Sequence, residues 1–349
     1  MGGDKIVNCE LDSEIFDKQI VRPLNLEIFS DEILTVRDNC DNSKWMYFGT
    51  LFVNKERKDR LIQQLNNLRC IKSNTWHHDV STCEDRCGYH DKNNTEIHYK
   101  ELDESNARFR IAQNWIKFVR DERSPKTDRL FYFNILGLNL SAMNLEMFGE
   151  GSNDLTIYNR FYRTTILGGL NYFFKGRKII IHNIFHDRGS QEFHQYIPWH
   201  AIHKIDLTNE NTSIIPENIQ FIDSDHRVSG KEESHLIQLI DILLGATYTC
   251  LHNPSVSVEK RKVGQLFKPV LTCLLDRKRM DYGPMSGAYY QSKFYRTSQV
   301  SFFPKNKFDM NTAPLDVYNF DRRIGNGKFY YERNIQVVDP SEVRLDRWF

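Results

Sequence analysis

Two aspartates stand where folding alone would not favour a charge. Asp187 ends the run from Lys178 to Asp187, whose nearly continuous branched apolar residues are typical of a buried strand. Asp241 lies in the most hydrophobic part of Glu232 to Leu251, a segment with helical spacing. An ionised carboxylate held against a core is unfavourable unless it is paired or binds a metal ion. Both residues are therefore candidates for chemistry.

The expected helix around Asp241 has a polar stripe beside its apolar face. Its members follow one another at spacings of four, three and four residues, which places them on one side of a helix. They are Ser234, Gln238, Asp241 and Gly245. One interpretation is an ordinary solvent-facing stripe on an amphipathic helix. The other is a polar surface turned into a functional site.

Strands and helices alternate along most of the chain, which indicates an α/β fold with helices on the faces of a sheet. We expect strands over residues 26–36, 45–53, 129–140, 178–187 and 218–223. We expect helices over residues 55–68, 107–119, 155–174, 191–202 and 232–251. Asp31 and Glu32 interrupt the first strand with charge, and a surface turn is the alternative explanation for them.

Two regions depart from this alternation. The segment Asn74 to Thr95 is polar and without a period, so it is expected to be a loop inserted at about 70–95. Beyond residue 255, one helix over Val258 to Arg279 precedes a long stretch rich in Tyr and Phe. We therefore expect a domain over 1–255 and a basic, aromatic-rich C-terminal extension over 256–349. A tail that simply wraps the core would give the same pattern.

Composition excludes several classes of protein. With 349 residues, 40% hydrophobic and 27% charged, the chain is neither disordered, collagen-like nor a coiled coil. The net charge of +1 argues against a general polyanion binder, but residues 256–349 hold 17 basic and 10 acidic residues. Residues 1–255 hold 30 basic and 36 acidic residues. An acidic part that binds metal ions and a basic part that binds phosphates would explain this asymmetry, as would charges scattered over solvated surfaces.

The sequence favours a cytoplasmic protein that does not enter a membrane. Its longest apolar runs, Phe131 to Leu140 and Leu236 to Leu244, fall short of the about 20 apolar residues that a membrane-spanning helix needs. The N-terminus resembles no secretory signal, and Ile6 stands where a myristoylation motif needs Ser or Thr. Seven cysteines form an odd set that suits a reducing compartment.

The inserted loop carries residues that could bind zinc. Cys83, Cys87 and His90 lie close together, with His77 and His78 before them. Thiolates and imidazoles are the ligands of tetrahedral structural Zn²⁺, which one of the two earlier histidines would complete. The spacing is looser than that of a double Cys-pair signature. A polar insertion with incidental thiols is the alternative.

Short basic clusters could contact nucleic acid, and two of them interleave with aromatic residues that could stack on unpaired bases. They are Lys55 to Arg60, Lys260 to Lys262, Arg277 to Arg279, Lys293 to Arg296, Arg322 to Arg323 and Lys328 to Tyr331. A solvated surface explains each cluster taken singly. His182 and His186 alternate with Ile184 on one face of their strand, and we expect them to pack or hydrogen-bond rather than to catalyse.

Together these segments resemble a widespread microbial family, domain of unknown function 3800, which is grouped with RNase H-like folds. The resemblance covers about residues 26–250, and its strongest part is a strand ending in Asp-Ser followed by a helix with Gln and Asp. The segments that carry it are Asp31-Glu32, Glu96 to Leu102, Asp187-Arg188, Phe221 to Ser224 and Leu236 to Gly245. After its first Asp-Glu the family usually has a small pair such as Ser-Gly, where this chain has Ile33-Leu34.

The resemblance implies an RNase H-like mixed sheet of about five strands flanked by helices. Carboxylates from the first strand, a later strand edge and the last helix would meet at one end of it and hold two Mg²⁺ or Mn²⁺ ions about 4 Å apart. The implied ligands are Asp31, Asp187 and Asp241, with Glu101 or Glu96 as the fourth carboxylate. The implied substrate contacts are Lys100, Arg188 and Gln238.

We therefore expect a metal-dependent nuclease or related phosphodiesterase that acts on DNA or RNA. The alternative is a non-catalytic RNase H-like subunit that binds nucleic acid or a partner protein, for example within a phage-defence system. The first-strand carboxylate is either Asp31 or Glu32. The positions of the carboxylates in the fold discriminate between these hypotheses.

Overall fold

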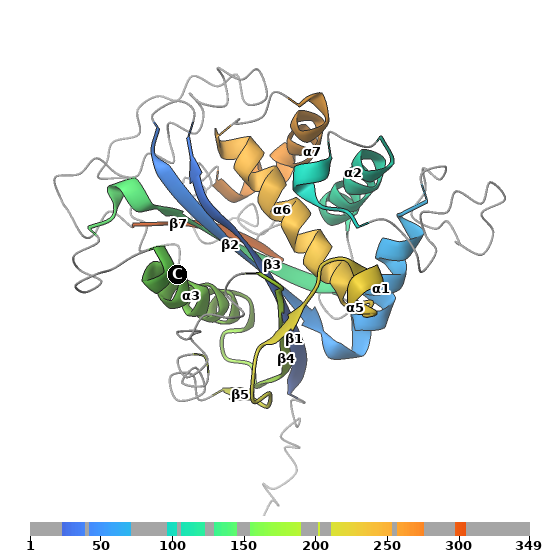
Figure 1. The fold of residues 1–349 in the computed structure, drawn as a ribbon. Coiled ribbons are helices and arrows are strands. Elements are labelled where there is room, and N and C mark those ends of the chain that lie inside the picture. Colours follow the sequence, from blue (N-terminus) through green and yellow to red (C-terminus); the bar gives the residue numbers. More distant parts are fainter. Residues whose placement is uncertain are drawn as a thin grey trace, which may run out of the picture.

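The computed structural model describes residues 23–38, 42–70, 96–102, 106–122, 129–144, 154–189, 202, 211–252, 257–275 and 297–304. Within these residues the chain forms one mixed seven-stranded sheet with helices on both faces (Figure 1). Cys83, Cys87 and His90, with the neighbouring His77 and His78, lie outside the described residues. So does the helix expected over 191–202, apart from Ile202.

The strands are β1 (Leu24–Arg37), β2 (Lys44–Asn54), β3 (Phe131–Asn139), β4 (Ile179–Asp187), β5 (Thr212–Ile214), β6 (Gln220–Ile222) and β7 (Ser298–Phe303). The helices are α1 (Lys58–Asn67), α2 (Asn106–Asp121), α3 (Asp154–Phe174), α5 (His226–Ser229), α6 (Ser234–His252) and α7 (Val258–Leu275). Short 3-10 helices are η1 (Lys55–Arg57), η3 (Tyr99–Glu101) and η5 (Leu140–Ala142).

The strand order is β5-β4-β1-β2-β3-β7, and β6 also pairs with β4. Strands β1, β2 and β3 are antiparallel, whereas β4 runs parallel to β1 and β7 runs parallel to β3. All five expected strands belong to this sheet, so the mixed α/β class with flanking helices is confirmed. Sequence reasoning missed β5 and β7, because β5 has three residues and β7 lies in a stretch without visible period.

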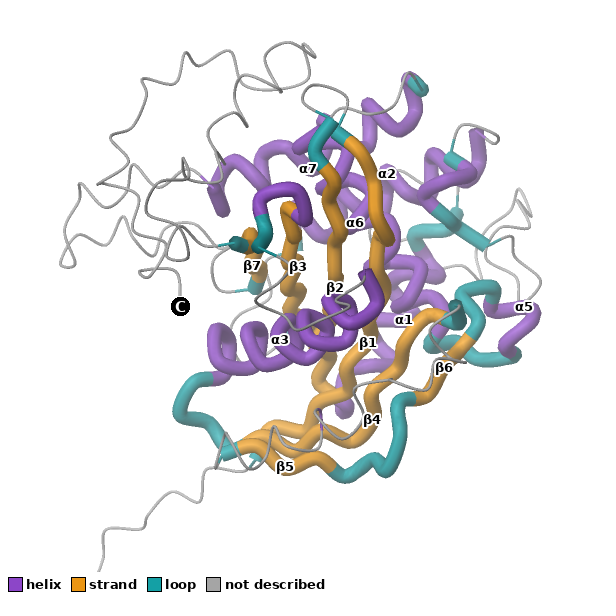
Figure 2. The backbone as a smooth tube through the Cα atoms, turned by 60° about the vertical axis from the view of Figure 1, so that its left-hand side comes forward, coloured by secondary structure: helices purple, strands orange, loops and turns teal. Residues whose placement is uncertain are grey.

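Helices cover both faces of the sheet (Figures 1 and 2). The α6 face packs against α1, α2, α6 and α7, and its core includes Phe29, Tyr47 and Phe185. The α3 face packs against α3, with Ile28 and Phe48 in its core. The described parts of the expected extension, α7 and β7, lie within these same layers, since α7 packs on α6 and β7 pairs with β3.

Within the described residues, α6 alone is long and apolar enough to cross a membrane. Of its most apolar 18-residue window, 89% is buried inside the structure. Such burial is typical of a central core helix.

A β-bulge interrupts the pairing of β4 with β1. Leu26 pairs with Ile181, and the next residue, Glu27, pairs with Asn183, so His182 is an extra residue in β4. A bulge of this kind reverses the phase of the side chains that follow it. Residues of β4 beyond His182 therefore face the side opposite to the one that strict alternation would give.

This bulge places Asp187 on the α6 face. Ile179 and Ile181 pack in the core of the α3 face, and strict alternation would send Phe185 and Asp187 to the same face. Instead Phe185 packs in the core of the α6 face, and Asp187 follows it two residues later.

The bulge also corrects the expectation that His182 and His186 share one face. His182 Nε2 lies 3.0 Å from Asn25 Oδ1, on the α6 face, and His182 Nδ1 lies 3.1 Å from Lys55 Nζ. His186 lies on the α3 face and contacts Tyr158. Both histidines do form hydrogen bonds, as expected.

Helix α6 lies close to the sheet because β2 has a glycine beneath it. Gly49 pairs with Asp31 across the β1–β2 ladder. A Cβ atom at Gly49 would lie 2.7 Å from Cγ1 of Ile240 and 2.9 Å from Cγ of Leu244. The absence of a side chain at Gly49 therefore lets α6, which carries Asp241, pack closely on β2 beside Asp31.

We predict that Gly49→Ala destabilises the protein by about 1–3 kcal/mol, because the added methyl group forces α6 away from β2. Urea denaturation would measure the free energy of unfolding. Gly168→Ala is the control, since a Cβ there would meet only Asn134 Nδ2 at 3.8 Å and Ala favours a helix. Equal stability of Gly49→Ala and the wild type would contradict this packing.

Candidate functional site

Three aspartates meet on the α6 face of the sheet. Asp31 follows Phe29 along β1, Asp187 ends β4, and Asp241 lies on α6 above them. Asp31 is 8% exposed, and both Asp187 and Asp241 interact with it electrostatically. We call Asp31, Asp187 and Asp241 the carboxylate cluster. Its members come from three elements that are far apart in sequence.

Burial raises the pKa of every carboxyl group in this cluster, and repulsion from neighbouring carboxylates adds to the effect. Burial is the largest cause in each case. Repulsion from Asp241 and Asp187 adds to the effect at Asp31, whose pKa is raised well above its usual value. The pKa of Asp187 rises to about 6, and that of Asp241 is also raised. The cluster therefore holds protons more tightly than isolated aspartates do.

The segment around η3 fixes the orientation of Asp241. The backbone N–H of Tyr99 donates to Asp241 Oδ2 at 2.6 Å, and His98 Nδ1 lies 3.6 Å from the same oxygen. The Tyr99 ring packs on Gly245, where a Cβ would lie 2.0 Å from the ring, and its hydroxyl pairs with Thr249. A glycine is needed at position 245 for this close approach.

Docking of this segment also settles the nature of the polar stripe on α6. Ser234 is 0% exposed and Gln238 is 1% exposed, so the stripe does not face solvent. It is covered in part by residues 96–102, whose Ile97 and Tyr99 contact Gln238 and Asp241. The solvent-facing alternative is therefore wrong.

Glu32 lies on the opposite face of β1 from Asp31. Tyr158 donates its hydroxyl hydrogen to Glu32 Oε2 at 3.2 Å, and His186 Nε2 lies 3.2 Å from the same oxygen. His186 Nδ1 is 2.9 Å from the Ser30 carbonyl oxygen. Burial raises the pKa of Glu32 to about 7. Of the two candidates Asp31 and Glu32, it is Asp31 that joins Asp187 and Asp241 on the α6 face.

The two candidates for a fourth carboxylate differ in their surroundings. Glu101 interacts electrostatically with Asp241 but forms an ion pair with Arg108, with 2.7 Å between Oε2 and Nη1. Glu96 accepts a hydrogen bond from Ser224 at 2.5 Å, and burial raises its pKa. Only Glu101 of these two is among the neighbours that shift the pKa of Asp241.

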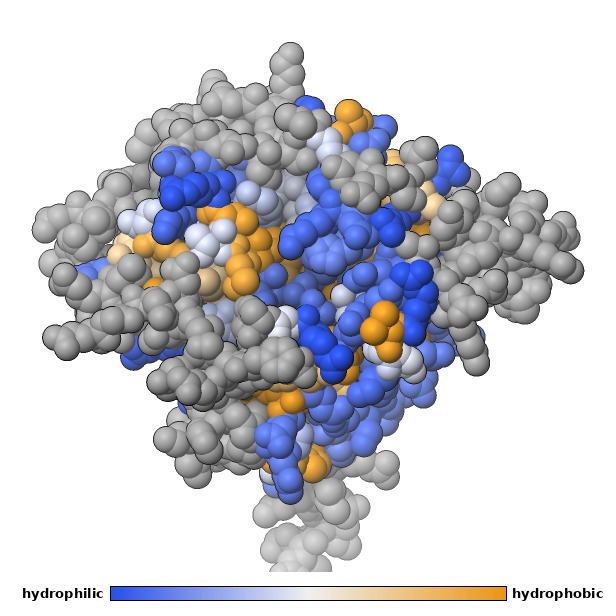
Figure 3. Space-filling model, viewed as in Figure 1, coloured by the Kyte–Doolittle hydropathy of each residue, from blue (hydrophilic) through white to orange (hydrophobic). Residues whose placement is uncertain are grey.

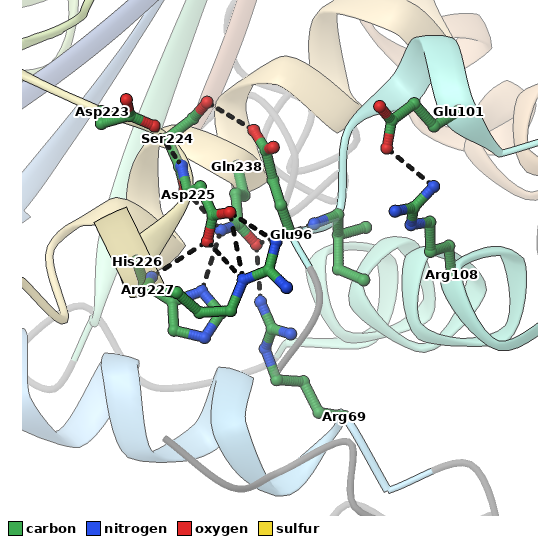
Figure 4. Close-up of polar contacts among 11 residues, drawn as sticks. Arg69, Glu96, Glu101, Arg108, Asp223, Ser224, Asp225, His226, Arg227 and Gln238 are labelled. Atoms are coloured by element: carbon green, nitrogen blue, oxygen red, sulfur yellow. Dashed lines mark hydrogen bonds and ion pairs between the residues drawn. The ribbon is translucent and has the colours of Figure 1, made fainter. Parts of the chain in front are cut away.

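Gln238 joins several elements one helical turn before Asp241 (Figure 4). Its Oε1 accepts from Arg69 Nη2 at 2.6 Å and from the N–H of Ile97 at 3.2 Å. Its Nε2 donates to the Ser224 carbonyl at 2.6 Å. Gln238 is thus buried and engaged within the chain, instead of facing a substrate as the sequence led us to expect.

Arg69 lies at the base of this network. It is 0% exposed, donates to His235 Nδ1 at 3.1 Å and stacks over Trp115. Burial lowers its pKa to about 9, which leaves it charged at neutral pH. Burial and the nearby guanidinium lower the pKa of His235 to about 2 and that of His226 to about 4. The group of Arg69, Gln238, His226 and His235 anchors α6 beside the carboxylate cluster.

The two expected basic contacts lie at the edge of the site. Lys100 is exposed, and its charge lowers the pKa of both Glu32 and Asp241. Arg188 is exposed, and its backbone N–H bonds to the Ile222 carbonyl at 2.9 Å. Both residues are therefore accessible next to the cluster.

The fit of these residues to a metal ion can be tested on the donor set. Carboxylate oxygens are the ligands that Mg²⁺ and Mn²⁺ prefer, and Oδ1 of Asp187 is buried without a hydrogen-bond partner. Among the residues that the structure describes, however, no group of three or more His, Cys, Asp or Glu side chains could hold an ion as it stands. The carboxylate oxygens are thus suitable ligands for Mg²⁺ or Mn²⁺, but the three side chains are not arranged around a common ion position.

Comparison with known proteins adds no information about function. No protein-family model, curated protein or solved structure matches the chain.

Sequence reasoning missed several residues that shape the site. His98 and Tyr99 precede Lys100 in the motif Glu96 to Leu102, and that proximity was a usable signal. Tyr158 and Arg69 had none, because each lies far from the motifs in sequence and reaches the site through tertiary packing alone.

We predict that Asp187→Asn stabilises the metal-free protein at high pH. The folded protein holds the Asp187 proton up to a pKa of about 6, whereas an unfolded chain releases it near pH 4. Ionisation of Asp187 therefore destabilises the fold progressively as pH rises through this window. The variant should gain about 1–3 kcal/mol over the wild type at about pH 8 and nothing at about pH 4.

Urea denaturation in EDTA at both pH values measures this difference. Asp59→Asn is the matched control, because Asp59 is exposed in the first turn of α1. It should not stabilise the protein, because it removes a charge that favours the start of α1 by about 0.3–1 kcal/mol. An effect of Asp187→Asn that does not vary with pH would show that folding does not raise the pKa of Asp187.

Proposed function

We propose that this protein is a metal-dependent phosphodiester hydrolase, of nuclease or related type, in which Asp31, Asp187 and Asp241 are the catalytic carboxylates. The observation that carries the proposal is their convergence on the α6 face, where Asp31 is buried, Asp187 and Asp241 are largely buried, and the charges of Asp187 and Asp241 act on Asp31. Folding gains nothing from gathering like charges, so a function that needs them is the better explanation.

We also infer an RNase H-like fold related to the family of domain of unknown function 3800. In support, β1, β2 and β3 form an antiparallel unit, and β4 and β6 extend the sheet in parallel on the other side of β1. Further support comes from the positions of the acidic residues. They belong to the first strand, to the end of a later strand and to the helix that follows the last of the five expected strands.

The residues around the cluster have distinct roles in this proposal. Asp31, Asp187 and Asp241 would hold Mg²⁺ or Mn²⁺, which when bound activates a water molecule and stabilises the leaving oxygen. Tyr99 holds Asp241 in place through its backbone N–H. Lys100 and Arg188 would attract the phosphate of the substrate. Gln238 positions α6 through Arg69 and Ser224.

Glu32 and Glu101 have supporting roles. Glu32 joins Tyr158 and His186 on the α3 face, where it links β1 to α3 and β4. Glu101 forms an ion pair with Arg108, and its charge acts on Asp241 from outside the cluster. We assign the metal ligands to the three aspartates for this reason.

A second candidate function is that of a non-catalytic RNase H-like module that binds nucleic acid or a partner protein. It is favoured by the side-chain arrangement itself, since the described residues include no group that could hold a metal ion as it stands. In that case the carboxylates would remain partly protonated at neutral pH, as the raised pKa of Asp187 allows.

We predict that Asp187→Asn and Asp241→Asn each abolish cleavage of labelled DNA or RNA in Mg²⁺ or Mn²⁺. Loss of one carboxylate removes both charge and a ligand, so the rate should fall by at least about 10²-fold, or about 2.7 kcal/mol of barrier. EDTA should abolish the wild-type activity as well.

The control is Asp59→Asn, which removes an exposed carboxylate of the same type away from the cluster and should cleave like the wild type. Cleavage that persists in Asp187→Asn and Asp241→Asn would rule out the proposed site. Absence of cleavage in the wild type with every substrate and metal would favour the binding module.

A further inference from the structure

We propose that the substrate is a nucleic-acid strand, and that the phosphates next to the scissile one bind at a surface formed by Lys100, Lys260 and Lys262. We call these three residues the cationic corner. This inference rests on the proposed function for the position of the scissile phosphate, and it goes further by distinguishing a polymer from a small phosphodiester.

The corner is where η3, α2 and the beginning of α7 meet. Lys260 Nζ donates to the backbone carbonyl of Lys100 at 2.8 Å and lies 6.0 Å from the ring centroid of Tyr99. Lys262 Nζ lies 5.8 Å from the ring centroid of Phe109 on α2. Tertiary packing thus brings Lys260 to Lys100 from 160 residues away in the sequence, and Lys262 lies on the neighbouring side of α7, over α2.

The corner adjoins the carboxylate cluster. Tyr99, which lies under Lys260 and precedes Lys100, donates its backbone N–H to Asp241. The charge of Lys100 reaches both Asp241 and Glu32. In the space-filling view from this side, the described surface over the middle of α6 is mainly hydrophilic (Figure 3). A strand with one phosphate at the cluster would therefore lead directly onto the corner.

Helix stability does not explain this placement of charge. Lys260, Arg261 and Lys262 lie in the first turns of α7, where the helix dipole disfavours cations, and Glu259 is the acidic residue in the first turn. Among the described residues, the ammonium groups of Lys100 and Lys262 have no ion-pair partner, and both side chains are exposed. Exposed lysines next to an acidic site can attract a polyanion that the carboxylates would otherwise repel.

The corner also indicates how the strand is bound. Tyr99 is buried and Phe109 is half-buried below Lys262, and the exposed large hydrophobic residues among those described are all aliphatic. Base stacking on the described surface is thus unsupported, and the contact is through charge. Binding by phosphate contacts alone is independent of sequence and weakens steeply with salt. A small phosphodiester would reach Lys100 but not the whole corner.

The test measures binding without cleavage. Fluorescence anisotropy in EDTA would compare labelled single-stranded DNA, single-stranded RNA and duplex DNA with the full chain. The double variant Lys100→Glu, Lys262→Glu changes two exposed side chains and should fold, which circular dichroism would verify. Its control is Lys117→Glu, Lys175→Glu, which makes the same change in net charge at two other exposed lysines.

We expect the double variant to lose at least about 10-fold in affinity at about 0.1 M salt, whereas the control loses less than about 3-fold. For single strands, the slope of log affinity against log salt should fall by about 0.7 for each phosphate that the variant no longer neutralises. Equal losses in the two variants, no binding by the wild type, or equal displacement by polyglutamate would overturn the proposal.

The outcome is separable from that of the proposed function. Asp187→Asn should bind the oligonucleotides at least as tightly as the wild type, because it removes a negative charge beside the strand. Loss of binding in Lys100→Glu, Lys262→Glu without any metal-dependent cleavage by the wild type would support the corner and refute the hydrolase. Cleavage by the wild type with unchanged binding in that variant would support the hydrolase and refute the corner.

Discussion

The removal of three neighbouring carboxylates from water is the constraint on which the rest of the structure depends. Asp31, Asp187 and Asp241 lie largely out of water, and burial is the largest cause of their raised pKa values. The fold offsets part of this with backbone donors. Asp31 accepts from the N–H of Glu32 at 2.8 Å, and Asp241 accepts from that of Tyr99. Asp187 keeps an oxygen without any such partner, so the arrangement is left incompletely satisfied.

Three local departures from regular structure produce the convergence. The extra residue His182 reverses the side-chain phase of β4 and places Asp187 on the α6 face. Gly49 lets α6 approach the sheet directly opposite Asp31, and Gly245 lets the Tyr99 ring dock on the same helix. Each feature acts through local packing or pairing, and all three act on the position of one site. Such agreement between independent elements is what a functional arrangement requires.

Much of the fold could be predicted from the sequence because its main elements have strong periods. The strand ending at Asp187 and the apolar helix around Asp241 were found within two residues of their observed bounds. The bulge was not predictable, since His182 fits an alternating strand as well as a bulge. The role of Gln238 was not predictable either. Helical spacing places this residue on the polar stripe, but it does not show that Arg69 donates a hydrogen bond to its side-chain oxygen. Strand β7 was not predicted because the residues around it in the sequence show no regular hydrophobic pattern.

The choice between Asp31 and Glu32 shows what the structure adds to sequence reasoning. Adjacent residues in a strand face opposite sides, so a motif alone cannot say which one joins a site. Here the contacts distinguish the two residues. Glu32 contacts Tyr158 and His186 on the α3 face, whereas Asp31 interacts electrostatically with Asp187 and Asp241 on the α6 face. Resemblance to a family supplied the expectation of a metal site, but the assignment of its ligands depends on these contacts.

The most direct test of the carboxylate cluster is calorimetric titration of the metal-free protein with Mn²⁺. If Asp31, Asp187 and Asp241 bind divalent ions, the wild type and Asp59→Asn should bind Mn²⁺ with the same affinity. Asp31→Asn, Asp187→Asn and Asp241→Asn should each lose at least about 10-fold in affinity, because each removes one oxygen ligand and one charge. Failure of the wild type to bind Mn²⁺, or unchanged affinity in the three cluster variants, would contradict a metal-binding site formed by these aspartates.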